Sequence, residues 1–135
     1  MAAWACEAQA LELEAKRARL RSMAEQLRLT HVALFNAPNV SWLLGGIDTH
    51  VLLSTTRGNV VALYVAERDR VEVLTTNNEY ARLIEEELAS PAYVGVRRDI
   101  TVLPWYGGSL ELAVRERLAG GHAGCDILLE GAEVQ

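Results

Sequence analysis

The segment VALFNAPNVSWLLGG, residues 32–46, constrains the fold of this chain more than any other part of its sequence. An apolar run of strand formers passes through Pro38 and Asn39 into a short helical stretch that ends at Gly45 and Gly46. Short apolar runs rich in Val and bounded by Pro, Asn and Gly are typical of strands and their turns. A glycine directly after a helical stretch is typical of a left-handed helix cap. The segment therefore predicts a strand, one helical turn and a cap in immediate succession.

A long amphipathic helix is predicted before this segment, over residues 8–29. Its Leu, Met and Ala residues recur at helical spacing, which is typical of a stripe in contact with a core. Glu12 and Lys16 stand four residues apart on the polar side, in the favourable order. Residues 1–10 are expected to form a flexible or helical lead-in.

Downstream, short runs of Val and Leu between turn formers predict further strands. They lie at residues 51–55, 60–65, 71–74, 92–96, 100–103 and 126–129. Helices are predicted over residues 79–88, capped by Asn77 or Asn78, and over residues 109–118. The short Gly-containing link between the first two of these strands predicts an antiparallel hairpin. This order of elements predicts an α/β fold in which helices pack on the faces of a mixed sheet.

Length and composition predict a single domain over residues 1–135. The chain has 135 residues, of which 50% are hydrophobic, as is ordinary for a globular protein. Its 13 basic and 18 acidic residues give a net charge of -5, which offers no attraction to nucleic acid or anionic lipid. No apolar run approaches the roughly 20 residues that cross a membrane, and the first ten residues lack the basic start of a secretory signal. We expect a cytoplasmic protein without nucleic-acid or membrane partners.

The cysteines, Cys6 and Cys125, lie at opposite ends of the chain without a paired spacing. In a reducing compartment such cysteines are expected to be free thiols.

The strongest local candidate for a functional loop is the triplet Asp48, Thr49 and His50. A carboxylate two residues from an imidazole could orient a substrate or bind a metal. A metal site needs three or four converging ligands, however, and the sequence supplies none beyond this pair. For His31 and His122 we expect surface or turn roles, because no motif of a Ser or Cys nucleophile accompanies them. The chain is therefore expected to carry no catalytic residue, cofactor or metal.

The order of these elements resembles the amino-terminal domain of the creatinase, prolidase and Xaa-Pro aminopeptidase family. That domain has a basic helix, a strand, a proline-containing turn and a motif similar to Asn-Ile-x-Tyr-Leu-Thr-Gly. Residues 39–45 of this chain read Asn-Val-Ser-Trp-Leu-Leu-Gly, with Trp42 at the tyrosine position and Leu44 at the threonine position. Residues 76–87, 104–106 and 124–126 add further similarity. The resemblance covers residues 16–129, nearly the whole chain.

The resemblance implies the mixed-sheet, ribonuclease-H-like fold of that amino-terminal domain. It also implies a carboxy-terminal pita-bread domain, in which two Asp, one His and two Glu hold two divalent metal ions (manganese, cobalt or zinc) that activate a water. None of those motifs can be placed on this chain. We therefore expect a non-catalytic domain of an Xaa-Pro dipeptidase or aminopeptidase-like metallopeptidase, with the catalytic domain as its partner and absent from the sequence.

By the same resemblance, the chain is expected to form a homodimer and to shape the substrate pocket. Trp42, Asp48, Thr49 and His50 are the residues expected to contact substrate or a partner. The alternative for Trp42 is a core anchor, which is common for a large aromatic residue between a helix and a sheet. The alternative for the chain is a free-standing binding or assembly module. A small enzyme that uses Asp48 and His50 is the third and least favoured hypothesis.

Overall fold

The computed structural model describes residues 3–45, 57–103, 110–126 and 133–134. The helices are α1 (Ala3–Leu27), α2 (Ala37–Leu43), α3 (Asn77–Arg82), the π-helix η1 (Leu83–Glu87), the 3-10 helix η2 (Pro91–Tyr93), α4 (Val94–Arg98) and α5 (Leu110–Arg117). The strands are β1 (His31–Asn36), β2 (Arg57–Val65), β3 (Arg70–Thr76), β4 (Ile100–Leu103), β5 (Ala123–Cys125) and β6 (Glu133–Val134). Helices and strands are interspersed along the chain, so the α/β class predicted from the sequence is confirmed.

The described strands form one mixed sheet in the order β4-β3-β2-β1-β5-β6. The inner strands β1, β2 and β3 pair antiparallel, and β2 and β3 form a hairpin. The remaining pairs, β1 with β5, β3 with β4 and β5 with β6, are parallel. Segments far apart in the sequence therefore lie side by side in the sheet, because β1 and β5 are neighbours.

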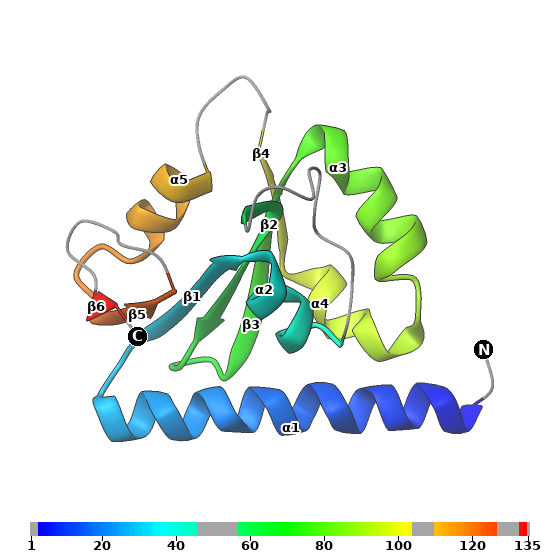
Figure 1. Cartoon of the computed structure of the whole chain (residues 1–135), viewed down its shortest axis with the longest axis horizontal. Coiled ribbons are helices and arrows are strands. Elements are labelled where there is room, and N and C mark those ends of the chain that lie inside the picture. Colours follow the sequence, from blue (N-terminus) through cyan, green and yellow to red (C-terminus); the bar gives the residue numbers. More distant parts are fainter. Residues whose placement is uncertain (1–2, 46–56, 104–109, 127–132, 135) are drawn as a thin grey trace.

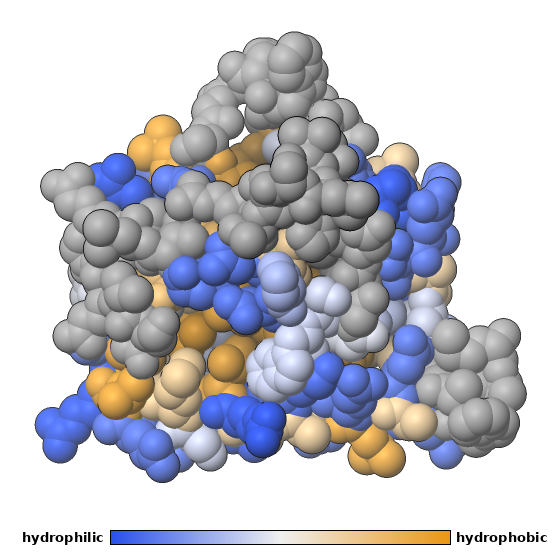
Figure 2. Space-filling view, viewed as in Figure 1, coloured by the Kyte–Doolittle hydropathy of each residue, from blue (hydrophilic) through white to orange (hydrophobic). Residues whose placement is uncertain are grey.

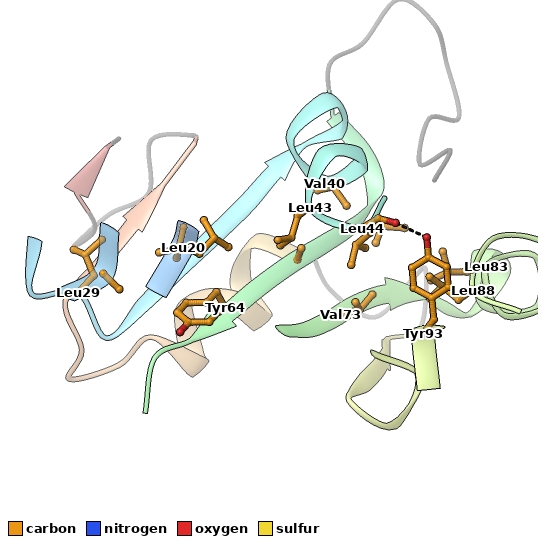
Figure 3. Close-up of a cluster of buried hydrophobic side chains, with 14 residues drawn as sticks. Leu20, Leu29, Val40, Leu43, Leu44, Tyr64, Val73, Leu83, Leu88 and Tyr93 are labelled. Carbon is orange, nitrogen blue, oxygen red and sulfur yellow. Dashed lines mark hydrogen bonds between the residues drawn. The ribbon is translucent and has the colours of Figure 1, made fainter. Parts of the chain in front are cut away.

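Both faces of the sheet are covered, as the alternation of buried side chains along β2 requires. Val60, Ala62 and Tyr64 pack on one face with α1, α2, η1 and η2, whereas Val61, Leu63 and Val65 pack on the other with α5. Figure 1 shows α1 running along one whole side of the molecule, below the sheet and α2. The larger cluster, on the α1 face, is drawn in Figure 3.

Asp69, in the turn between β2 and β3, fixes α1 against the sheet. Its carboxylate accepts hydrogen bonds from Tyr64 Oη and from Arg21 Nη1, both at 2.7 Å. Partial burial opposes ionisation, but the Tyr64 hydroxyl and the charges of Arg17 and Arg21 hold the pKa of Asp69 below its usual value. Burial, together with the bond to Asp69, raises the pKa of Tyr64 to about 12. A charged contact therefore positions α1 in addition to its apolar stripe.

Most predicted elements lie close to their predicted bounds. The lead-in is helical from Ala3, and Gly45 has the predicted left-handed conformation, with φ of 76°. The helix predicted over residues 79–88 is α3 followed by η1, and Thr76 stands at its N-cap instead of Asn77 or Asn78.

The strand predicted over residues 92–96 is wrong, because this stretch is the helical turn η2 followed by α4. Ser90 caps it by accepting a hydrogen bond from the Ala92 amide at 3.3 Å, and Pro91 occupies a first-turn position. Arg97 Nη1 donates to the Leu88 and Ser90 carbonyls. These local bonds favour a helix over the strand preference of the valines.

Two predicted strands fall wholly or mostly outside the described residues. Residues 51–55 lie outside the described residues, so the predicted hairpin between them and residues 60–65 also lies outside. The hairpin that the structure describes is formed by β2 and β3. Residues 127–129 also lie outside. The described strand in that region is β5, which ends one residue before Asp126.

Candidate functional site

The N-terminal end of α2 is closed by a carboxylate from the far end of the chain. Asp126 Oδ1 accepts a hydrogen bond from the Phe35 amide at 2.7 Å. Its Oδ2 accepts from the Asn36 amide and from Asn39 Nδ2, both at 2.9 Å. The Phe35 and Asn36 amides belong to the end of β1, and Asn39 lies in the first turn of α2. Asp126 thus ties the end of β1 to the start of α2, where a negative charge is favourable, while Asn36 makes no side-chain capping bond.

The C-terminal end of α2 is braced by Tyr93 of η2. Tyr93 Oη donates a hydrogen bond of 2.6 Å to the Leu44 carbonyl, drawn as a dashed line in Figure 3. A Cβ atom on Gly45 would lie 3.0 Å from the same hydroxyl, so the tyrosine fits closely against the glycine. The chain therefore leaves α2 from a fixed point, immediately before residue 46.

Trp42 lies on the outer side of α2. Its side chain is 37% exposed, and Lys16 Nζ of α1 stands 5.3 Å from the ring centroid, within reach of a cation–π contact. Lys16 is held in turn by Glu12 at 2.8 Å. The core beneath α2 is filled instead by Val40 and Leu43. Trp42 is therefore not a core anchor.

The other residues of the predicted contact set, Asp48, Thr49 and His50, lie outside the described residues. Trp42 lies on α2, near the end of the described segment. Leu43, Leu44 and Gly45 separate it from residue 46.

The remaining titratable candidates have structural roles. His31 Nδ1 lies 2.9 Å from Thr30 Oγ1, which also accepts a hydrogen bond from the His122 amide, also at 2.9 Å. Burial lowers the pKa of His31 against the opposing charges of Glu72 and Glu67. These contacts fix the turn before β1. Surface or turn roles were the prediction for both histidines: His122 is exposed in the turn before β5, whereas His31 is the partly buried first residue of β1.

Cys125 is a buried free thiol on β5. Burial, and to a lesser extent the charge of Asp126, raises the pKa of Cys125 to about 11. A buried thiol with so high a pKa is a poor nucleophile.

The described part of the chain does not fit a metal centre. Among the described residues no group of three or more His, Cys, Asp or Glu side chains is placed to hold a metal ion. Within the same residues, no helix combines the length and the hydrophobicity needed to cross a membrane. On the face seen in Figure 2, hydrophilic and hydrophobic side chains are interspersed over the described surface.

The contact of Asp126 with the start of α2 is not predictable from the sequence. Residues 39–45 and 124–126 each resemble one family, but no sequence pattern links them. The parallel pairing of β1 and β5 brings them together.

Comparison with known proteins identifies the fold. No protein-family model and no curated protein matches the sequence. Among solved structures, an Xaa-Pro dipeptidase from Bacillus anthracis is similar over 87% of this chain, with a TM-score of 0.55 and 19% identity. This chain covers 28% of that dipeptidase.

Two further structures are similar over nearly their whole length. The N-terminal creatinase/prolidase-like domain from Corynebacterium diphtheriae has a TM-score of 0.55 and 13% identity, over 90% of this chain and 92% of its own. The aminopeptidase P, an Xaa-Pro aminopeptidase, from Streptococcus thermophilus has a TM-score of 0.52 and 12% identity, over 91% of each chain. At these identities the likeness concerns the fold, and the fold of this chain is that of the creatinase/prolidase-like N-terminal domain.

Proposed function

We propose that this chain is the non-catalytic N-terminal domain of an Xaa-Pro dipeptidase or aminopeptidase-like metallopeptidase. In this proposal it contributes to dimerisation and to the shape of the substrate pocket. The proposal rests on the fold shared with the Xaa-Pro peptidase structures. Two divalent metals would belong to a carboxy-terminal catalytic domain, since the described residues hold no suitable ligand group.

The observation that best supports a contact role is the exposure of Trp42. A large aromatic side chain on a surface, positioned by a neighbouring cation, is typical of residues that dominate interfaces. Here the lysine and the brace at Leu44 hold the helix end that leads to residues 48–50. Trp42 and that triplet would together form the contact with substrate or with a second subunit.

A peptidase assay tests the non-catalytic part of the proposal. The 135-residue chain is incubated with an Xaa-Pro dipeptide and Mn²⁺ or Co²⁺, and release of proline is followed. We expect no hydrolysis above the buffer rate. Turnover at ordinary enzyme rates would overturn the proposal and favour a small enzyme built on Asp48 and His50, whose alanine variants would then lose it.

Sedimentation velocity tests the contact part. We expect the chain to dimerise with rising concentration, and Trp42→Ala to shift the equilibrium toward monomer. Tyr80→Ala is the matched control, because Tyr80 is a similarly exposed aromatic residue, at 39%, on α3. Equal behaviour of the two variants would remove Trp42 from the contact.

The alternative is a free-standing binding module with the same fold. The groove between α1 and α4 described below favours it. The reading frame beyond the codon for Gln135 separates the two: codons for a domain with two Asp, one His and two Glu as metal ligands support the peptidase proposal, and a stop codon there favours the binding module.

A further inference from the structure

A groove of about 280 Å³ lies between α1 and α4, on the face of the molecule that carries α2. Apolar side chains line part of it, from α1, α2, β3 and α4: Leu13, Leu43, Leu44, Val71 and Val96. The charged residues in its lining are Glu14, Arg17, Arg70, Arg98 and Asp99. The groove is slightly smaller than the sites of about 300–1,000 Å³ that hold drug-sized molecules, so it suits a smaller ligand.

The ion pairs of this groove are looser than the other ion pairs among the described residues. Arg17 lies 3.9 Å from both Glu14 and Asp69, and Arg70 lies 3.8 Å from Asp99. All three distances exceed the hydrogen-bonding limit of about 3.2 Å. The guanidinium groups therefore keep N–H donors that these carboxylates do not satisfy.

Tight pairs outside the groove make the contrast clear. Arg21 reaches Asp69 at 2.7 Å and Arg117 reaches Glu72 at 2.6 Å. Each is a charge-assisted hydrogen bond, the usual state of a structural arginine pair. The groove arginines are thus not held in the way that the structural arginines of the same chain are.

Arg17 carries a second sign of loose pairing. Its Nε is buried and, among the described residues, is the one buried side-chain polar atom without a hydrogen-bond partner. A buried donor left without a partner is unfavourable. Asp69 Oδ1 stands 3.9 Å from this atom, so the pair with Asp69 holds Arg17 only loosely.

The charge of the groove points to an anion. Arg98 is exposed and makes no ion pair within the described residues, whereas Arg17 and Arg70 share nearby carboxylates. The groove is lined by three arginines and two carboxylates. Adding the neighbouring ion pair of Asp69 with Arg21 brings the count to four arginines and three carboxylates. The local surplus of one positive charge contrasts with the net charge of -5 of the chain.

We propose that this groove binds a small organic monocarboxylate with an apolar body, the chemistry of an N-acylated aliphatic amino acid. Its carboxylate would accept from the arginine donors, since a guanidinium fork matches a carboxylate. Its apolar body would lie against the leucine and valine side chains. A monoanion matches the single surplus charge, and the apolar lining disfavours a phosphate dianion without an apolar group. The site stands independently of the peptidase proposal.

The test is a titration of the full chain at pH 7, followed by two-dimensional amide NMR. N-acetyl-L-leucine is the probe, N-acetyl-L-leucinamide its uncharged twin, and inorganic phosphate the simple anion. We expect saturable shifts at the amides of Leu44, Val71 and Gly95 with the acid alone, at millimolar concentrations. Equal binding of the amide, equal binding of phosphate at the same amides, or no saturable shift with the acid would each overturn the proposal.

Two variants assign the binding to the groove. Arg98→Gln should weaken binding of N-acetyl-L-leucine about fivefold, because it removes one charge-assisted contact. Arg19→Gln is the matched control, since Arg19 is an exposed arginine of α1 that does not line the groove. Amide spectra without ligand confirm that both variants are folded. An equal effect of the two substitutions, or no effect of Arg98→Gln, would overturn the proposal.

Discussion

The two ends of α2 differ in how the rest of the molecule uses them. At the N-terminal end, Asp126 satisfies two backbone amides and the Asn39 side chain. At the C-terminal end, Trp42 is exposed, and Leu43 and Leu44 line a groove with loosely paired charges. Both ends have polar backbone groups satisfied from within the chain, since Tyr93 Oη donates to the Leu44 carbonyl, but the C-terminal end also exposes the large aromatic side chain of Trp42. We therefore call the N-terminal end of α2 its structural half and, following our proposals, the C-terminal end its binding half.

The largest effect is expected from Asp126→Ala, which breaks the structural end. The substitution leaves the Phe35 and Asn36 amides and the Asn39 amide group without their acceptor. We expect a loss of about 3 kcal/mol in the free energy of unfolding, measured by urea titration. Glu25→Ala, which removes an exposed carboxylate of α1, is the control and should change it by less than about 0.5 kcal/mol. Similar losses in both variants would mean that Asp126 is an ordinary surface carboxylate.

A smaller effect is expected from Gly45→Ala, directly after the C-terminal end of α2. The positive φ and the Tyr93 hydroxyl at 3.0 Å from an added Cβ both oppose a side chain there. We expect a loss of about 1–2 kcal/mol in the free energy of unfolding by urea titration.

Gly95→Ala is the control for this substitution, because a Cβ on Gly95 of α4 meets no heavy atom within 4 Å. Alanine in a helix should leave stability unchanged or raise it. A Gly45→Ala variant as stable as Gly95→Ala would show that the brace by Tyr93 is not tight.

The reactivity of Cys125 reports whether the structural end is closed. The thiol is buried, and its pKa is raised to about 11, so little thiolate exists near pH 8. In a Cys6→Ser background we expect slow labelling by a thiol reagent. The rate should rise about tenfold per pH unit while the pH stays below that pKa, since only the thiolate reacts.

Opening the structural end should accelerate this labelling. Asp126→Ala removes the carboxylate bonds to the Phe35 and Asn36 amides of β1 and leaves the backbone bonds between β1 and β5. We therefore expect labelling of Cys125 at pH 8 to be about tenfold faster, in proportion to the more frequent local opening. Unchanged labelling in this variant would mean that Asp126 does not keep the end of β5 closed.

The periodic elements of this fold were predictable from the sequence, because they depend on short-range patterns. The apolar stripe of α1, the valine-rich β2 and β3 and the cap at Gly45 each follow from neighbouring residues. The predicted strand over residues 92–96 failed for a local reason as well, since the Ser90 cap and the Arg97 bonds outweighed the preference of Val94 and Val96 for a strand.

The contacts that define the candidate sites were not predictable in this way. Asp126 meets Asn36 across 90 residues, and the groove joins side chains of α1, α2, β3 and α4. Such meetings depend on the strand order, which no single segment encodes. The exposure of Trp42 also depends on tertiary packing: Val40 and Leu43 fill the core, and α1 places Lys16 beside the ring.

Trp42→Ala is expected to have the smallest effect on stability. It is also the most direct test of the division of α2 into a structural half and a binding half. Its free energy of unfolding is compared by urea titration with those of the wild-type chain and of Tyr80→Ala, at a concentration where the chain is monomeric. We expect both variants to lie within about 0.5 kcal/mol of the wild type, because an exposed side chain with one cation–π contact adds little. A loss of about 2 kcal/mol or more in Trp42→Ala alone would contradict the account, since Trp42 would then serve the fold and not a partner.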